Sequence, residues 1–245
     1  MFQPKPLHLN LDNPLVVVHD ELQPCPYIQG RDARMPLQWP VGSMTPELID
    51  RCLAQGYRRS GPFLYRTRCP KCQACEPTRI EVSRFRWTRS FRRVLQRGDR
   101  DLRMQVSIPK VDETRIALFN KHRNERNLGL SERMVDRQEY TGFLVDTVCD
   151  TRELSFWKEE QPVAIATTDF GVESMSLVYC FFDTAFDRYS PGTYSILKHL
   201  ELATETGRKF VYLGMYVASN SHLRYKARFL PQERLRNEVW ETFDA

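Results

Sequence analysis

The feature that most constrains the fold is the order of hydrophobic patterns in residues 109–245. Two stretches with helical spacing come first, and three stretches with strand character follow them. A helix, a strand, a short helix and a closing strand complete the order. This alternation predicts an α/β (α+β) fold, in which helices flank a mixed sheet.

Individual segments of this half give specific expectations. Asp112 is expected to begin the first helix, and Ser131 the second helix, "SERMVDRQEYTGFLVD". The strand "ESMSLVYCFFD" is largely apolar, which predicts a central place in the sheet. "ERLRNEVWETF" is interpreted as a single closing strand. The helix "GTYSILKHLELATETG" should end at Gly207 and turn four residues inward: Ile196, Leu197, Leu200 and Ala203.

The chain divides into residues 1–108, a basic region that contains cysteines, and residues 109–245. Its first 50 residues are rich in proline and are expected to be mostly loop. "TPELIDRCLAQG" then predicts a short helix, capped by Thr45 and stopped by Gly56. A second helix through "FRRVLQRG" can be capped by Thr88 or by Ser90.

Positive charge is concentrated in one part of the chain. The net charge is +5, yet residues 51–110 hold sixteen Lys or Arg against four Asp or Glu. Arginines alternate there with Phe85, Trp87 and Phe91. Guanidinium groups match phosphate oxygens and aromatic rings can stack on unpaired bases, which favours RNA binding. The alternative is a solvated arginine face with the aromatic side chains turned into the core.

Hydropathy and cysteine content indicate where the protein works and the state of its thiols. No apolar run approaches the length of a membrane span, so we expect no membrane partner and a cytoplasmic location. The seven cysteines are an odd number, which favours free thiols or metal ligands over disulfides. A monomer is the default expectation.

The predicted order of elements is similar to the N-acetyltransferase (GNAT) superfamily. In that fold a central strand leads into a helix whose N-terminus faces the acyl donor. The corresponding loop here is "DRYSPGTYSIL", in which Gly192 permits close approach of the backbone and Arg188 adds charge. An ordinary turn between a strand and a helix explains the same residues.

Longer motifs resemble one family, the bacterial aspartate/glutamate leucyltransferases, which are related to the eukaryotic arginyl-tRNA–protein transferases. The motifs span nearly the whole chain in order: "CPYIQGRDARM", "YRRSG", "YRTRCPKCQACEPTRI", "GTYSILKHLE", "YLGMYV" and "YKARFLPQE". The resemblance implies an aminoacyltransferase that moves leucine from leucyl-tRNA to proteins beginning with Asp or Glu, and so marks them for N-degron proteolysis. Pro191 and Met215 depart from the residues common in relatives.

The implied reaction is aminolysis of an ester, which needs no cofactor and no covalent enzyme intermediate. Tyr194, at the start of the expected helix, and Tyr225 and Lys226, after the following strand, are the candidate catalytic residues. Tyr216 and Asn220 are further candidates for substrate binding, together with Arg188 and Gly192. Each of these residues can instead be structural.

An acceptor with an acidic first residue requires a positively charged pocket, because guanidinium groups pair bidentately with carboxylates. The family motifs contain the arginines and tyrosines expected to form it: Arg31, Arg34, Arg58, Arg79, Tyr27 and Tyr65. The arginines can alternatively pair with carboxylates or carbonyl groups of the chain itself.

The motif "CPKCQAC" places Cys69, Cys72 and Cys75 at intervals of three, and Cys25 supplies a fourth thiol. Four thiolates suit structural zinc or an iron–sulfur centre. The spacing departs from the eukaryotic relatives, so a corner of packed thiols without metal is the alternative. Arginyl transfer, acetyl transfer from acetyl-CoA and a noncatalytic zinc-ribbon RNA module are the competing functions.

Overall fold

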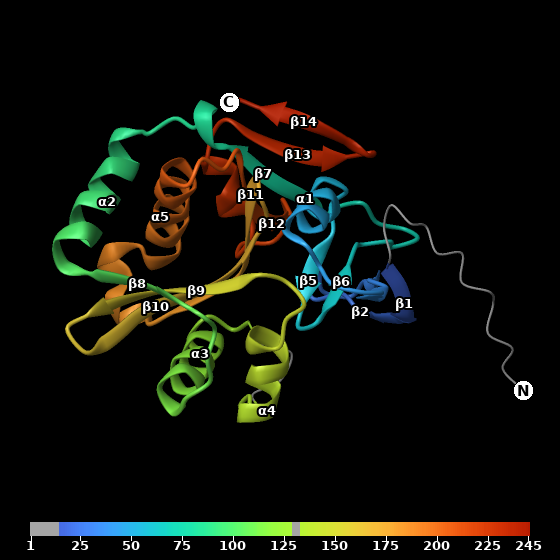
Figure 1. The fold of residues 1–245 in the computed structure, drawn as a ribbon, viewed down its shortest axis with the longest axis horizontal. Helices are drawn as coiled ribbons and strands as arrows, with labels where there is room; N and C mark the ends of the chain where they lie inside the picture. The colour runs from blue at the N-terminus through green and yellow to red at the C-terminus, as the bar shows by residue number, and fades with distance from the viewer. Residues whose placement is uncertain (1–14, 129–132) are drawn as a thin grey trace, which may run out of the picture.

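The computed structural model describes residues 15–128 and 133–245, and a mixed sheet of eight strands forms the centre of that part (Figure 1). The strand order is β14-β13-β7-β12-β11-β10-β9-β8. The strands are β7 (Glu76–Glu81), β8 (Arg103–Ser107), β9 (Thr151–Lys158), β10 (Gln161–Phe170), β11 (Ser174–Phe182), β12 (Phe210–Tyr216), β13 (Gln232–Arg236) and β14 (Val239–Phe243).

Helices cover both faces of this sheet (Figure 1). α2 and α5 share one hydrophobic core with Ala164 of β10, while α3 and α4 pack with the next residue, Ile165, on the opposite face. None of the described helices is long and apolar enough to cross a membrane. The helical segments are α1 (Pro46–Ala54), η1 (Val82–Arg84), α2 (Arg89–Asp101), α3 (Glu113–Glu125), α4 (Arg137–Tyr140), η2 (Thr141–Val145), η3 (Thr184–Tyr189), α5 (Pro191–Glu205) and η4 (Arg224–Arg228).

The first part of the chain builds smaller sheets beside the large one. One has the order β1-β4-β6-β5, and β2 pairs with β3. A buried ion pair joins the two parts, because Arg59 of β5 meets Asp169 of β10 at 2.9 Å. β7 and β8 precede residue 109 and yet belong to the large sheet. The strand bounds are β1 (Leu15–His19), β2 (Leu22–Pro24), β3 (Asp32–Arg34), β4 (Leu37–Pro40), β5 (Arg58–Ser60) and β6 (Phe63–Tyr65).

The observed architecture confirms the mixed α+β prediction. β11 is central, and α5 connects it to a parallel neighbour, β12, as the order of patterns predicts. The caps also agree: Thr45, Thr88 and Asp112 each accept a backbone N–H in the first turn of α1, α2 and α3. The four residues of α5 that were expected to face inward are all buried.

Two expected elements differ from the structure. The second helix of residues 109–245 is shorter than predicted: α4 starts after Asp136, whose capping box with Glu139 satisfies the first N–H groups, and continues as one π-helical segment. Ser131 lies outside the described residues. The closing strand is a hairpin, β13 and β14, because Asn237 and Glu238 adopt positive φ angles and turn the chain back.

The aromatic residues between the arginines face the core. Phe85 and Phe91 are buried, and Trp87 packs edge-on against Phe85 with ring centroids 5.0 Å apart. The arginines of α2 are exposed. The aromatic side chains are therefore structural, and of the two RNA-binding features only the arginine face remains.

Two histidines are buried inside the fold. His199 of α5 bonds Thr168 Oγ1 at 2.7 Å and the Ser195 carbonyl at 2.6 Å. His122 of α3 lies 3.0 Å from the carbonyl oxygen of Phe182. Burial lowers the pKa of each to about 4, from an ordinary value of 6.5. Both side chains are therefore neutral in the folded protein at neutral pH.

These histidines predict acid sensitivity. Between pH 6.5 and 4 the unfolded chain binds protons that the folded chain excludes, so the free energy of unfolding should fall with pH, by up to about 3 kcal/mol per histidine. Urea unfolding at pH 7 and pH 4.5 measures the fall. His199→Gln should lose less stability than the parent chain over this interval, and equal losses would contradict the assignment.

Candidate active site

The neighbouring strands β11 and β12 pair only at their beginnings. Their parallel register covers Ser174–Ser176 against Phe210–Tyr212, although β11 continues to Phe182 and β12 to Tyr216. β11 remains paired with β10 and β12 with β7 beyond that point. The two strands therefore separate in the middle of the sheet, and we call this region the splay.

The side chain of Arg58, from β5, fills the splay. Its Nη2 donates to the Leu177 carbonyl of β11 at 2.8 Å. On the other side it meets Gly214 of β12, where an added Cβ would lie 3.0 to 3.1 Å from the guanidinium atoms. Gly214 also has φ +88°, a conformation that glycine adopts readily. The glycine and the arginine thus fit one another.

The charge of Arg58 has no carboxylate partner among the described residues. Its Nη1 is buried and makes no hydrogen bond, and the whole residue is 8% exposed. The adjacent Arg59 is equally buried but is neutralised by Asp169 through two contacts of 2.9 and 3.0 Å. A buried charge without a partner is costly, so Arg58 is a candidate for binding an anion.

Lys226 adds a second buried cation to the splay. Its Nζ donates to the Met215 carbonyl of β12 at 2.7 Å. Desolvation, and secondly the positive charge of Arg58, lower the pKa of Lys226 to about 7. The ammonium group is therefore in balance with the neutral amine at neutral pH. Lys226 and Arg58 interact repulsively here, which an anion would relieve.

Three further predicted residues lie beside this pair. The hydroxyls of Tyr27 and Tyr65 interact, and this interaction, together with burial, raises the pKa of Tyr27 while the nearby Arg58 charge opposes the rise. Asn220 donates to the Tyr27 carbonyl at 2.9 Å, which ties the loop after β12 to the first part of the chain. A chain of neighbouring interactions thus connects five of the predicted residues: Lys226, Arg58, Tyr27, Tyr65 and Asn220.

Arg126 and His222, which the sequence did not single out, lie close to this group. Arg126 Nη2 is 3.2 Å from His222 Nδ1, and its guanidinium lies 5.2 Å from the ring centroid of Phe182. An added Cβ on Gly192, in the first turn of α5, would touch the same ring at 3.4 Å. Tyr225 is 37% exposed; desolvation of its hydroxyl raises its pKa, and the positive charge of Arg126 opposes the rise. These residues therefore connect the start of α5 to η4 and the splay.

Three other predicted arginines are not brought into the splay by any contact of the described residues. Arg34 forms an ion pair of 2.6 Å with Asp20, and Arg79 forms one of 2.6 Å with Glu233. Arg31 is exposed. Acids of the chain thus neutralise the charges of Arg34 and Arg79. In this they differ from Arg58, which has no carboxylate partner among the described residues.

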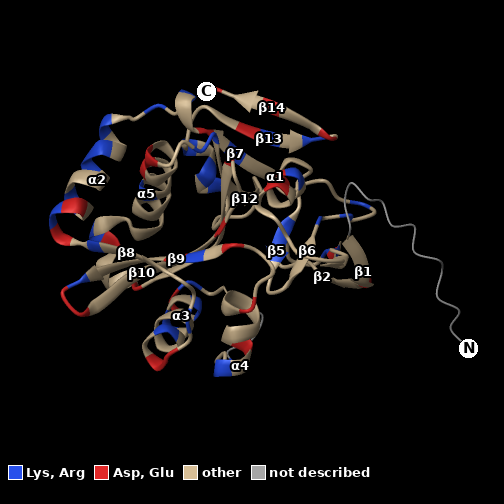
Figure 2. Cartoon of the chain, in the orientation of Figure 1, with Lys and Arg blue, Asp and Glu red and all other residues tan. Residues whose placement is uncertain are grey.

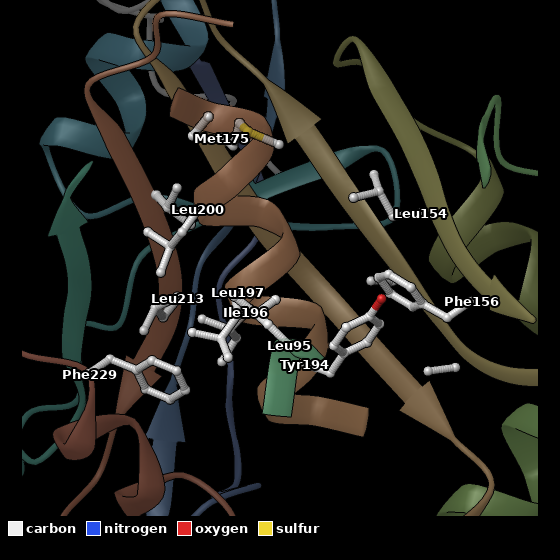
Figure 3. Close-up of a cluster of buried hydrophobic side chains, with 14 of the residues drawn as sticks. Leu95, Leu154, Phe156, Met175, Tyr194, Ile196, Leu197, Leu200, Leu213 and Phe229 are labelled. Carbon is white, nitrogen blue, oxygen red and sulfur yellow. The ribbon is translucent and has the colours of Figure 1, made fainter. Parts of the chain in front are cut away.

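The remaining predicted aromatic residues and Arg188 have other surroundings. Tyr194 is 1% exposed, packs against Phe156 in the core (Figure 3) and donates to Asp99 at 2.9 Å. The ring of Tyr216 is covered by Arg234 at 3.7 Å. Arg188 donates to the Tyr189 hydroxyl at 2.5 Å. These contacts do not bring any of the three to Lys226.

The four cysteines share one corner of the molecule. Burial raises the pKa of Cys75 to about 12, and the Cys25, Cys69 and Cys72 thiols add to the rise. The backbone N–H of Arg34 donates to Cys69 Sγ at 3.4 Å. Within the described residues no set of three or more His, Cys, Asp or Glu side chains is arranged to hold a metal ion. A metal at this corner stays a prediction, with the corner of packed thiols as its alternative.

Comparison with known proteins gives two adjoining matches to family models. Residues 23–93 match "Arginine-tRNA-protein transferase, N terminus", and residues 114–236 match "Arginine-tRNA-protein transferase, C terminus". Together the models cover the cysteine corner, β5, the splay and α5.

Relatives match over most of the chain. The aspartate/glutamate leucyltransferase of Paracoccus denitrificans is 34% identical over 89% of this chain and 82% of its own length. That of Bradyrhizobium diazoefficiens is 32% identical over 91% and 90%, and that of Halorhodospira halophila 33% over 88% and 92%. Among solved structures, L-PGS from Bacillus licheniformis aligns with a TM-score of 0.46 at 13% identity, over 62% of this chain and 50% of that one.

The fit between Gly214 and Arg58 predicts an asymmetric response to alanine. Gly214→Ala adds a Cβ at 3.0 Å from the guanidinium as well as the strain of a positive φ. Gly30→Ala adds the strain alone, because nothing lies within 4 Å of it. Urea unfolding should show a loss of roughly 1 kcal/mol for Gly30→Ala and at least twice that for Gly214→Ala. Equal losses would contradict the close fit.

The cysteine corner predicts a low metal content. Because the thiols are not arranged as a ligand set, we expect less than roughly a tenth of an equivalent of zinc or iron in protein purified without added metal. Elemental analysis of the purified chain measures this quantity. Close to one equivalent, removed only by a strong chelator, would show that the corner rearranges around a metal.

Proposed function

We propose a function from one premise: this chain belongs to the family of the aspartate/glutamate leucyltransferases and arginine-tRNA-protein transferases. The proposed reaction transfers leucine from leucyl-tRNA to the α-amino group of proteins that begin with Asp or Glu. The product begins with leucine, which marks it for N-degron proteolysis. Its tRNA substrate places the reaction in the cytoplasm.

The observation that supports this proposal most is the unpaired charge of Arg58. The splay holds the buried guanidinium of Arg58, the partly protonated amine of Lys226 and no carboxylate of the described residues. An incoming Asp or Glu side chain would supply the missing negative charge and accept hydrogen bonds from a rigid fork of donors. A neutral first residue would leave the guanidinium unpaired, so the site selects for acidic acceptors.

The chemistry requires a bond exchange and two proton movements. The neutral α-amine attacks the ester carbonyl, a C–N bond forms, and the C–O bond to the tRNA ribose breaks. The amine nitrogen loses a proton and the ribose oxygen gains one. Because the unperturbed pKa of an α-amino group is about 7.7–8.0, an acceptor near neutral pH must still be deprotonated in part.

Lys226 is the candidate for proton transfer. Its pKa is about 7 in the free protein, and a bound carboxylate would raise it toward the pKa of the acceptor α-amine, so the two amines can exchange a proton. Tyr225 keeps its proton, since its pKa lies above the ordinary value, and its hydroxyl can donate a hydrogen bond to the developing oxyanion. Tyr194 keeps its proton for the same reason, and its hydroxyl is already used by Asp99.

The choice of leucine over arginine as the donor amino acid rests on the names of the relatives. The family models carry the name of the arginine donor, so arginyl transfer to the same acceptors is the second candidate. Acetyl transfer from acetyl-CoA has no comparable support.

A matrix of donors and acceptors tests the proposed function. The purified protein is mixed with leucyl-, arginyl- or phenylalanyl-tRNA and with peptides that begin with Asp, Glu, Asn or Lys. We expect radiolabelled leucine on the Asp and Glu peptides only. Arginine on those peptides would favour the second candidate, and leucine on the Lys peptide would overturn acidic selection.

Variants of Arg58 test the basis of selection. Arg58→Lys keeps the charge but not the fork, and Arg58→Gln removes both. We expect kcat/KM for an Asp peptide to fall about tenfold and a hundredfold respectively, while the low value for the Asn peptide changes little. Because the measured quantity is the ratio of two substrates, a loss of folded protein cancels.

Arg34→Gln is the matched control, since Arg34 already has Asp20 as its partner. It should leave the ratio of Asp to Asn peptide unchanged. An unchanged ratio in both Arg58 variants, or an equal fall in the control, would show that another group reads the acceptor.

A further inference from the structure

α2 is rich in arginine, and several basic segments follow one another along its ribbon (Figure 2). At 100° per residue, positions 89, 93, 97 and 100 fall on the side of the helix opposite the buried Phe91, Leu95 and Gly98, and position 92 lies at the edge of that side. These positions extend over about 16 Å, at a rise of 1.5 Å per residue. Their side chains are exposed: Arg89, Arg92, Arg93, Arg97 and Arg100.

Most of this charge is uncompensated. Arg89, Arg92 and Arg93 have no ion-pair partner among the described residues, and Arg97 bonds only the carbonyl oxygen of Arg188. Arg100 alone is paired, with Asp101.

The other acid of the helix points elsewhere, because Asp99 accepts from the Tyr194 hydroxyl and from Lys198. The first two turns of α2 therefore present three unpaired guanidinium groups to solvent.

The exposed side chains of α2 indicate what kind of partner could bind there. α2 exposes no large hydrophobic side chain, and a stable protein interface normally needs such anchors. The one aromatic residue within α2, Phe91, is buried, and Trp87 before it is partly buried against Phe85, so the helix itself offers no ring on which an unpaired base could stack. The exposed arginines of α2 can each bind a phosphate group, and their spacing along the helix suits the backbone of paired RNA.

The position of α2 gives this surface a place in the proposed reaction. α2 packs on α5 and η3 through the Tyr194–Asp99 and Tyr189–Asp101 hydrogen bonds. The first turn of α5 adjoins Phe182, which connects through Arg126 and His222 to the splay. The last turn of α2 therefore lies beside the start of α5.

We propose that the outer face of α2 binds the phosphate backbone of the acceptor stem of the donor tRNA. This inference rests on the proposed function, since it assigns a surface to the donor of that reaction. The surface contributes affinity and orientation, and the splay contributes the choice of acceptor. Its loss should therefore raise KM for charged tRNA and leave kcat at saturating tRNA unchanged.

A triple variant, Arg89→Gln, Arg92→Gln and Arg93→Gln, tests the surface. The affinity for leucyl-tRNA is measured at several salt concentrations. For binding to a duplex backbone, the slope of log K against log salt should become shallower by roughly 0.9 for each phosphate that is no longer neutralised, about two to three in total. At low salt the affinity should fall at least about tenfold.

A matched control removes the same charge from other faces. Arg133→Gln, Arg137→Gln and Lys209→Gln are exposed positions on or near α4 and before β12. The control should keep the salt slope of the parent chain. If both triples lower the slope equally, only net charge matters and the assignment to α2 is wrong.

Two leucylated donors of different length can test this inference independently of the proposed function. The donors are a leucylated stem-loop with the acceptor-stem sequence and a leucylated CCA trinucleotide without a stem. We expect the α2 triple to lose at least about tenfold in kcat/KM with the stem-loop and little with the trinucleotide.

Each other outcome has a distinct meaning. Equal use of the stem-loop by the parent chain and the α2 triple would overturn the inference while leaving leucyl transfer intact. No transfer by the parent chain from either donor would overturn the proposed function itself. Unchanged RNA binding in the triple would also overturn the inference, and would favour an acidic protein as the partner.

Discussion

A buried guanidinium without a carboxylate organises this molecule. Arg58 reaches from a small sheet into the middle of a large one and holds apart β11 and β12 by bonding one strand and contacting the other. Gly214 accepts it because it lacks a side chain. Lys226 then satisfies a carbonyl that the separated strand leaves unpaired. Two positive charges are thus placed where the sheet opens, at an energetic cost that a bound anion would reduce.

The surrounding fold keeps this arrangement in place. The neighbouring Arg59 pairs its charge with Asp169 and fixes the small sheet against β10. α5 connects the two separated strands and fills the core on one face, and α2 packs on it with its arginines outward. The molecule therefore combines a site for a negatively charged side chain in the middle of the sheet with a surface on α2 for a negatively charged backbone. A transferase with an acidic acceptor and an RNA donor needs both.

Much of the fold was predictable because it depends on local patterns. Helix caps such as Thr88 and Asp112 and the inward stripe of α5 are readable from neighbouring residues. The hairpin after β13 was missed because its turn uses Asn237 and Glu238 without a glycine. The site was only partly predictable, since a partner such as Glu233 for Arg79 lies 154 residues away. Sequence spacing alone could not show which arginine lacks an acid.

The pKa of Lys226 tests the central claim most directly. It can be followed by NMR titration of isotopically labelled lysine, with Lys226→Met to assign the signal. We expect a value of about 7 in the free protein. A saturating peptide that begins with Asp should raise it by about one unit or more, because a carboxylate beside two cations favours the charged amine, whereas an Asn peptide should not. An ordinary lysine pKa in the free protein, or the same response to both peptides, would contradict the claim.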